Sequence, residues 1–289
     1  MVASRFRLPK LTPVRQCLSR PSYLKRPNIR TMPLTPFDTA DAEAIEFFRE
    51  NGWAVINLLD EEQTLELQRW VNEVMDWRDE DGNWLHYREM TDSGPRLCRT
   101  ENFVPYHEGL RGLLTKGRVL DTASALLGEP AVLYKEKINY KAAGGAGFAP
   151  HQDAPAYRFV QQHISCMIAI DDADAENGCL EAVSHRHGEV LPMNEDGCIR
   201  QDVVDSMEWE SISVPAGSTL WFHSRTPHRS AANNSRRARR ALYPTYNALR
   251  EGDLRDAYYE QKFAEFAASE VDGSRVQVSL INDFQGKPV

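Results

Sequence analysis

Cysteine is scarce in this chain. The cysteines are odd in number and scattered, with no two spaced as a CxxC pair, and they are Cys17, Cys98, Cys166, Cys179 and Cys198. Such a set argues against a disulfide framework and favours free thiols in a reducing compartment. Cys166 and Cys179 lie in apolar stretches, so we expect them to be buried as small hydrophobic side chains.

Long apolar runs and internal repeats are also missing. No stretch approaches the roughly 20 apolar residues that a membrane-spanning helix needs, so we predict no membrane partner. The hydrophobic content of 42% and the charged content of 26% are those of an ordinary globular domain. We therefore predict one domain, residues 34–289, that is large enough to enclose a substantial core.

Acidic residues are absent from residues 1–33, which contain eight lysines or arginines. Removing these eight from the 34 basic residues of the chain leaves 26 against 42 acidic ones, a net charge of −16 for the remainder. A body this acidic lacks the basic face that nucleic-acid binding requires. We therefore predict no nucleic-acid partner, while the oligomeric state stays open.

The basic leader, residues 1–33, has the composition of an organellar transit peptide, because it is rich in arginine and contains serine but no acid. This predicts mitochondrial import. The alternative is a disordered tail, because Pro9, Pro13, Pro21 and Pro27 interrupt any long amphipathic helix. Met32 offers an internal start that would give a cytoplasmic form without the leader.

The first half of the remaining chain has helical periodicity. Helices are predicted over residues 39–51, ended by Gly52, and over 61–74, capped by Asp60, with a short strand at 53–56 between them. Residues 76–107 are polar, aromatic and irregular and are predicted to form a long loop. A further helix is expected over 113–127.

From residue 131 the periodicity changes to that of strands. Strands are predicted at 131–141, 164–170, 179–183, 211–214, 219–222 and 241–247, with turn signals between them, and a last helix at 253–268. Many short strands with such turns favour an antiparallel barrel or jelly roll. The predicted fold is therefore mainly β with flanking α-helices.

One motif carries most of the chemical information. His151 and Asp153 are two residues apart, so on a strand they project from one face, and His228 follows 77 positions later. Two imidazoles and one carboxylate form the ligand set of a non-haem Fe(II) site with open coordination positions. Eleven residues after His228, Arg239 is a fixed cation able to hold a carboxylate bidentately. Arg236, Arg237 and Arg240 are rivals for that role, and Arg237 would share the strand face of Arg239.

Several segments in order resemble the phytanoyl-CoA dioxygenase family of Fe(II)/2-oxoglutarate oxygenases. They are residues 47–56 (FFRENGWAVI), 151–153 (HQD), 177–181 (NGCLE), 184–188 (SHRHG), 215–218 (PAGS) and 228–230 (HRS). The resemblance covers about residues 41–250. It implies a double-stranded β-helix core, a jelly roll of the cupin-like type, at about 131–250.

The resemblance also implies a site. His151, Asp153 and His228 would bind Fe(II), and Asp153 favours hydroxylation, because related halogenases lack the carboxylate. Arg239, assisted by Ser230, would bind the distal carboxylate of 2-oxoglutarate, and Gln152 would approach this cosubstrate. O2 is the second cosubstrate, and ascorbate is expected as a reductant. His223 is the rival of His228, but only His228 places Arg239 at the spacing of the family.

The segment from Tyr134 to Tyr157 resembles family members that hydroxylate small organophosphonates, such as 2-aminoethylphosphonate and its trimethylammonium analogue. Lys135 and the predicted substrate residues Lys137, Asn139 and Lys141 form one polar strand face, which is either the mouth of the barrel or a solvated outer face. Tyr157 and Arg158 are predicted to wall the substrate pocket. Ring faces for a quaternary ammonium, or else core packing, are expected of Tyr140, Tyr157 and Trp221.

The predicted function is hydroxylation of a small polar or anionic molecule by an Fe(II)/2-oxoglutarate-dependent dioxygenase. Alternatives are a hydroxylase of phytanoyl-CoA-like acyl groups or of specialised metabolites, and a jelly-roll binding protein without turnover. A zinc hydrolase is disfavoured, because Arg239 and Ser230 would then have no role.

Overall fold

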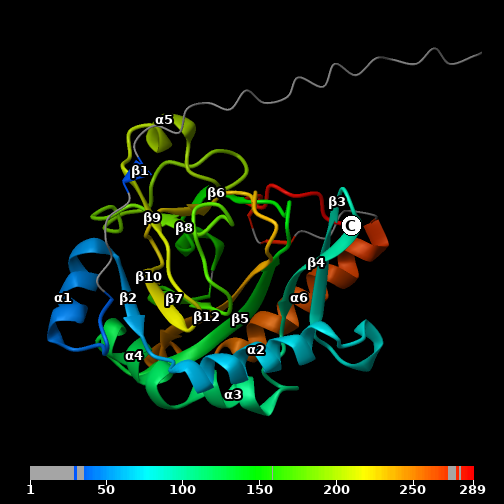
Figure 1. Cartoon of the computed structure of the whole chain (residues 1–289), viewed down its shortest axis with the longest axis horizontal. Coiled ribbons are helices and arrows are strands. Elements are labelled where there is room, and N and C mark those ends of the chain that lie inside the picture. The colour runs from blue at the N-terminus through cyan, green and yellow to red at the C-terminus, as the bar shows by residue number, and fades with distance from the viewer. Residues whose placement is uncertain (1–28, 31–35, 158, 273–277, 280) are drawn as a thin grey trace, which may run out of the picture.

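A computed structural model describes residues 29–30, 36–157, 159–272, 278–279 and 281–289. Within this part, two sheets form the centre of the molecule (Figure 1). The first has the strand order β1 (Ile29–Arg30), β9 (Trp209–Ile212), β8 (Leu180–Ala182), β11 (His228–Ser230), β6 (Phe148–His151). The second has the order β2 (Trp53–Asn57), β10 (Ser218–His223), β7 (His163–Ala169), β12 (Arg239–Ala248), β5 (Ala131–Lys141), β4 (Gly94–Glu101), β3 (Leu85–Thr91).

The two sheets pack face to face through apolar side chains of their inner surfaces. Met167, Leu220 and Phe222 of the seven-stranded sheet lie in one buried cluster with Leu180 and Ile212 of the five-stranded sheet. Neighbouring strands run antiparallel, apart from the parallel pair β1 and β9. This is the predicted jelly roll, and it leaves a polar region at the β6, β5 and β4 end of the sandwich.

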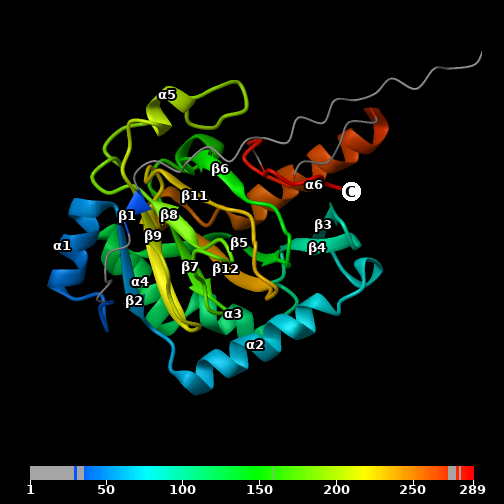
Figure 2. The same ribbon diagram turned by 45° about the horizontal axis from the view of Figure 1, so that its top comes forward.

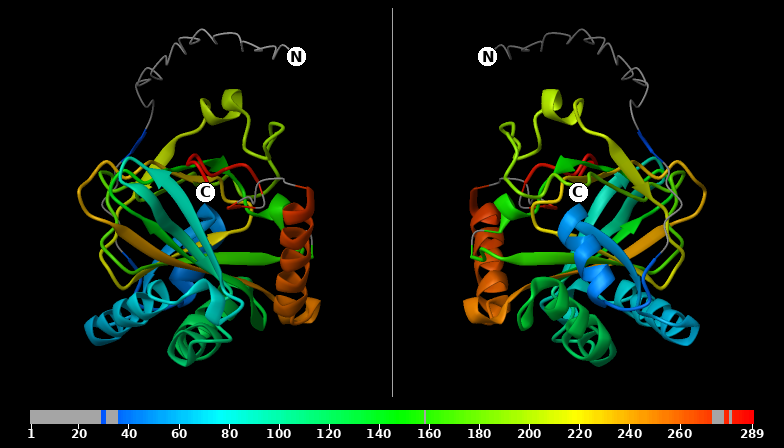
Figure 3. Two further views of the ribbon diagram at one scale, coloured as in Figure 1. Left: turned by 90° about the vertical axis from the view of Figure 1, so that its right-hand side faces the viewer. Right: turned by 90° about the vertical axis from the view of Figure 1, so that its left-hand side faces the viewer.

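Helices cover the outer face of the seven-stranded sheet (Figures 1 and 3). They are α1 (Ala42–Asn51), α2 (Glu61–Met75), α3 (Glu108–Thr115) and α4 (Gly117–Leu127). Their apolar stripes, among them Phe48, Leu67 and Leu110, bury against Ile168 and Leu242 of the sheet. The helix α6 (Arg255–Asp272) contacts β5, and α5 (Gln201–Val204) lies in the loop between β8 and β9. Short 3-10 turns are at Asp79–Asp81, Ala154–Ala156 and Leu249–Glu251.

The helix boundaries confirm the predicted Gly52 and Asp60, whereas α1 begins at Ala42, later than the predicted residue 39. Asp41 accepts the backbone N–H groups of Glu43 and Ala44 at the start of α1, and Gly52 ends this helix with a left-handed φ of 80°. Asp60 and Gln63 form a capping box at the start of α2.

Two of the predicted elements are wrong. Residues 76–107 contain the antiparallel hairpin β3–β4 instead of only a loop, because its inner face carries charged side chains that hide the apolar alternation of a strand. The predicted helix at 113–127 begins earlier and is broken between α3 and α4, where Lys116 is extended and Gly117 has a φ of 60°.

Most of the leader lies outside the described residues. Ile29 and Arg30 are described, and their backbones pair with Trp209 and Glu210 of β9. This end of the leader is therefore joined to the five-stranded sheet. Cys98, Cys166, Cys179 and Cys198 are free and buried, as expected for the cysteines in the described part of the chain.

Candidate active site

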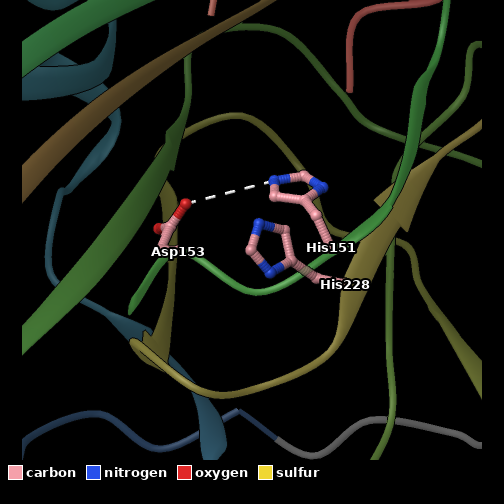
Figure 4. Close-up of side chains that lie close together, drawn as sticks. All are labelled: His151, Asp153 and His228. Carbon is pink, nitrogen blue, oxygen red and sulfur yellow. Dashed lines mark ion pairs between the residues drawn. The ribbon is translucent and has the colours of Figure 1, made fainter. Parts of the chain in front are cut away.

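His151, Asp153 and His228 come together at the open end of the sandwich (Figure 4). His151 ends β6 and is the direct partner of His228, the first residue of β11. One ligand atom from each of the three residues lies within 4.8 Å of the others, and His151 Nε2 is 4.0 Å from Asp153 Oδ1. The expectation of a continuous strand was wrong in one detail. The strand ends at His151, and Asp153 is delivered by the turn that leads into Ala154–Ala156.

Neighbouring groups orient each of these side chains. The Nδ1–H of His151 donates to the carbonyl of Ala149 at 2.7 Å, and that of His228 to the carbonyl of Thr226 at 3.0 Å. Ser165 donates to Asp153 Oδ2 at 2.8 Å. The two Nε2 atoms and Asp153 Oδ1 are thereby left for a ligand. Outer hydrogen bonds of this kind are typical of metal sites.

Their protonation states also suit a metal. Burial lowers the pKa of His228 to about 4. Burial opposes ionisation of Asp153, but His228, Lys137 and His151 hold its pKa well below the usual range. A neutral imidazole and an ionised carboxylate are the forms that bind a divalent ion, so the three residues fit a non-haem iron with open positions.

A first pocket, with an empty volume of about 450 Å³, extends from this centre between the sheets. It is lined by His228, Ser230, Tyr243 and Thr245, among others. Arg239 is not among its lining residues, but it lies on the same face of β12 as Tyr243, four positions along the strand. It is 1% exposed, and its Nε and Nη1 have no hydrogen-bond partner. A buried guanidinium with unused donors fits a carboxylate such as that of 2-oxoglutarate.

The other arginines considered for the cosubstrate role are exposed or paired with carboxylates. Arg237 is exposed and pairs with Asp174 at 2.6 Å. Arg240 pairs with Asp171 at 2.7 Å, and Arg236 is exposed. His223, the rival of His228, accepts the backbone N–H of Arg225 and is outside the three-residue cluster.

A second pocket, with an empty volume of about 330 Å³, adjoins the first and shares Lys137, His151, Asp153 and Asp283 with it. Its walls carry four cations and three carboxylates: Arg99, Lys135, Lys137, Lys262, Glu101, Asp153 and Asp283. Arg99, Lys135 and Lys262 are 2%, 3% and 5% exposed. Lys262 bonds to Glu101, whereas Arg99 keeps an Nη2 without a hydrogen-bond partner.

Lys135 and Lys137 have no carboxylate within ion-pair distance among the described residues. Instead, Lys135 lies 4.2 Å from the centre of the Tyr157 ring, and Lys137 lies 5.4 Å from that of Tyr243. Burial lowers the pKa of both lysines. An anion between them would favour their charged forms, so this pocket is suited to an anionic guest.

The predicted substrate residues separate into groups. The structure places Lys137 and Tyr157 at the second pocket, while Asn139 lines the first and bonds to Arg99 Nε at 2.9 Å. Lys141 lies elsewhere: its Nζ donates to Ser230 Oγ at 2.9 Å and to backbone carbonyls near Arg239. Arg158 is outside the described residues. The solvated-face alternative for this row is wrong, because Lys135 is 3% and Lys141 4% exposed.

Other predicted positions differ from expectation. Gln152 lines neither pocket, and its amide bonds to the backbones of Glu189, Leu191 and Arg225. Tyr140 and Trp221 pack in the core beneath the helices, so core packing, the alternative to a role in binding ammonium, is confirmed for both.

Sequence reasoning missed Arg99, Glu101, Lys262 and Asp283. The alternation of Arg99 and Glu101 along β4 was a usable signal, because both side chains face the pocket. Asp283 is an ordinary aspartate in a polar C-terminal segment and carries no signal of its own.

Comparison with known proteins bears on the family. The family model described as phytanoyl-CoA dioxygenase (PhyH) matches residues 48–241. A methylphosphonate hydroxylase of Gimesia maris is 47% identical over 232 residues, which are 80% of this chain and 89% of that protein. A 2-aminoethylphosphonate dioxygenase of an uncultured bacterium is 39% identical over 76% of this chain and 86% of its own length.

The chain belongs to the phytanoyl-CoA dioxygenase family. It is an enzyme of the Fe(II)/2-oxoglutarate-dependent dioxygenase class, as predicted. Among solved structures, EctD from S. alaskensis with 2-oxoglutarate and 5-hydroxyectoine superposes with a TM-score of 0.65, covering 74% of this chain and 78% of that one at 17% identity. This likeness confirms the double-stranded β-helix fold.

The bacterial relatives do not support the predicted mitochondrial import. No helix in the described part of the chain is long and apolar enough to span a membrane.

Proposed function

We propose that this enzyme hydroxylates a small organophosphonate, with His151, Asp153 and His228 as iron ligands. The observation that carries the proposal is the division of the site into two pockets that share the candidate metal centre. The β12 face that borders the first pocket carries a buried arginine with unused donors, and the second pocket is walled by buried cations. In this proposal cosubstrate and substrate therefore occupy separate binding regions next to the metal.

In this proposal Arg239 binds the distal carboxylate of 2-oxoglutarate, with Ser230 as a further donor. Lys141 belongs to this end of the site, because it bonds to Ser230 and pairs in register with Arg239. We therefore assign Lys141 to cosubstrate binding instead of the substrate binding predicted from the sequence. Gln152 holds two loops against the end of β6 and acts by positioning the motif.

The phosphonate group binds in the second pocket. Arg99 Nη2, Lys135 and Lys137 offer donors and positive charge to its oxygens. The two relatives named for phosphonates support this substrate class. An acyl-CoA tail is disfavoured, because seven of the thirteen lining residues of this pocket are charged.

When bound, iron and 2-oxoglutarate supply the O2-dependent conversion of a C–H bond to C–OH, with release of succinate and CO2. The chain supplies orientation. The cations hold the phosphonate so that its adjacent carbon lies toward the metal centre, and Tyr157 and Tyr258 wall the pocket against bulk water. Asp153 stays ionised beside Ser165 and keeps its lone pairs directed to the metal.

The test is succinate formation from 2-oxoglutarate, Fe(II), O2 and ascorbate with a panel of phosphonates, betaines and phytanoyl-CoA. We expect phosphonate-coupled succinate that is lost in His151→Ala and Asp153→Ala, with circular dichroism unchanged. His185→Ala is the matched control, because the side chain of this exposed histidine bonds to the carbonyl of Glu50, outside both pockets.

Each contrary outcome has a distinct meaning. Unchanged turnover in both ligand variants would refute the proposed centre. Slow succinate formation independent of every substrate would keep the oxygenase class and refute the phosphonate. Binding of 2-oxoglutarate without any succinate would favour the binding-protein alternative.

We also propose that residues 34–289 act as one catalytic domain. Deletion of residues 1–33 is then expected to leave kcat and KM within about twofold of the full chain, although it removes the short β1 pairing. A fluorescent reporter fused to residues 1–33 tests the mitochondrial prediction, and a cytoplasmic signal would refute it.

A further inference from the structure

The C-terminal segment 281–289 forms a strap that runs between β6 and β3 (Figures 1 and 2, red). At one end it pairs with β6, through the bonds from Ala149 N to Asp283 O at 2.7 Å and from Gln285 N to Gly147 O at 3.0 Å. At the other end it pairs with β3, through Met90 N to Lys287 O at 2.8 Å and Val289 N to Arg88 O at 3.0 Å. The strap therefore joins the exposed edges of the two sheets and is fixed at both ends.

The side chain of Asp283 points from this strap into the site and lines both pockets. It is 3% exposed. Its Oδ2 lies 3.3 Å from His151 Nε2, and its Oδ1 has no hydrogen-bond partner. Asp283 is outside the three-residue ligand cluster, so it stands beside the centre as an additional buried carboxylate.

This carboxylate has no lysine or arginine within ion-pair distance among the described residues. With His151 Nε2 given to the metal, no hydrogen-bond donor in the described part of the chain faces Asp283 Oδ1. A buried carboxylate without a donor is strongly disfavoured. Arg99 is near enough to act on Asp283 electrostatically, but it makes no ion pair with it among the described residues, and its Nε and Nη1 bond to Asn139 and to the carbonyl of Val278. Lys137 also has no ion pair with Asp283 in the described part of the chain.

We propose that Asp283 is a specificity-determining residue that binds the ammonium group of an aminoalkylphosphonate. This inference rests on the proposed function. The unused donor of Arg99 and the unused acceptor of Asp283 line the same pocket, so the pocket offers complementary charges to both ends of a zwitterion. Methylphosphonate has no cation to offer, and its anionic oxygens would meet an unpaired carboxylate.

The first test uses the unmodified enzyme. The kcat/KM for 2-aminoethylphosphonate is compared with that for propylphosphonate, in which a methyl group replaces the ammonium. We expect a preference for the amino compound of roughly 10- to 100-fold, because a charged hydrogen bond is satisfied only by it. Anaerobic calorimetric titration of the Fe(II)/2-oxoglutarate complex should show the same preference in Kd.

The second test is Asp283→Asn. We expect the preference to fall to near one, with kcat/KM for propylphosphonate and methylphosphonate equal or higher. Asp196→Asn is the matched control, because Asp196 accepts from the neighbouring strap residue Asn282 at 3.2 Å on the exposed side. This control should keep the preference of the unmodified enzyme.

The outcomes separate the two proposals. Turnover of alkylphosphonates without preference for the amino compound would uphold the proposed function and overturn the role of Asp283. An equal loss on all phosphonates in Asp283→Asn would also overturn it, because it would make Asp283 a structural support of the strap. No turnover of any phosphonate by the unmodified enzyme would refute the proposed function itself.

Discussion

Arginine side chains that are neighbours in the sequence differ in function because they differ in burial and in bonding partners. Four arginines lie between residues 236 and 240, yet Arg239 is the one that is buried with donors unused. Alternation along β12 turns Arg240 toward Asp171, and Arg237, which precedes the strand, is exposed and pairs with Asp174. A guanidinium in such a place has a planar pair of donors that a lysine ammonium cannot reproduce.

Arg239→Lys is expected to raise the KM for 2-oxoglutarate by roughly 10- to 100-fold, because bidentate binding of the distal carboxylate is lost. Arg237→Lys is the control, since this exposed side chain pairs with Asp174. Steady-state succinate assays over a range of 2-oxoglutarate measure both. An equal rise of KM in the two variants would show that Arg239 is not the cosubstrate residue.

Two strands and one helix position the charged side chains of the second pocket. The strands β4 and β5 lie side by side, with Arg99 opposite Asn139 and Glu101 opposite Lys137, so their inner faces make one charged wall. The helix α6 completes that wall with Tyr258 and Lys262. It is held on β5 by Arg255, which bonds to both oxygens of the fully buried Glu136, at 2.5 and 2.9 Å.

Arg255→Met is expected to lower the free energy of unfolding by about 3–5 kcal/mol, because it leaves Glu136 buried without its cation. Arg250→Met removes a bond to Glu129 at an exposed position and should lower the free energy of unfolding far less, because solvent screens exposed ion pairs. Urea unfolding followed by tryptophan fluorescence compares the two. Similar losses in both variants would mean that the buried pair does not hold α6.

The whole molecule contains several histidines that its interior keeps neutral. Burial lowers the pKa of His163, His223 and His228 from 6.5 to about 4. In the unfolded chain these histidines take up protons near pH 6.5, whereas in the folded protein they do so only near pH 4. The unfolded state therefore binds more protons across this interval and is favoured as the pH falls.

The metal-free protein should accordingly lose stability as the pH falls from about 6.5 to about 4, by on the order of 1–3 kcal/mol per histidine. Urea unfolding at half-unit pH steps measures this slope. His163→Phe should make the slope shallower, because it removes one titrating group that makes no hydrogen bond. A stability that rises on acidification, or an unchanged slope in His163→Phe, would contradict this account.

The sequence alone determined the features that depend on local order. The sequence showed the helix-ending Gly52, the cap Asp60, the alternation along residues 131–141 and the order of the motifs, because each reflects contacts within a few residues or a pattern shared with a family. It failed at β3 and β4, where charged side chains face inward, since periodicity assumes that buried faces are apolar.

Only the tertiary structure decided which charged residues meet. Arg99, Lys262 and Asp283 come from a strand, a helix and the C-terminal strap, and their sequence separations give no reason to place them in one pocket. The structure also moved Lys141 to the end of the site near Arg239 and turned Gln152 toward backbone carbonyls. Long-range packing brings these groups together, and the buried charges then require the partners from which we infer the substrate.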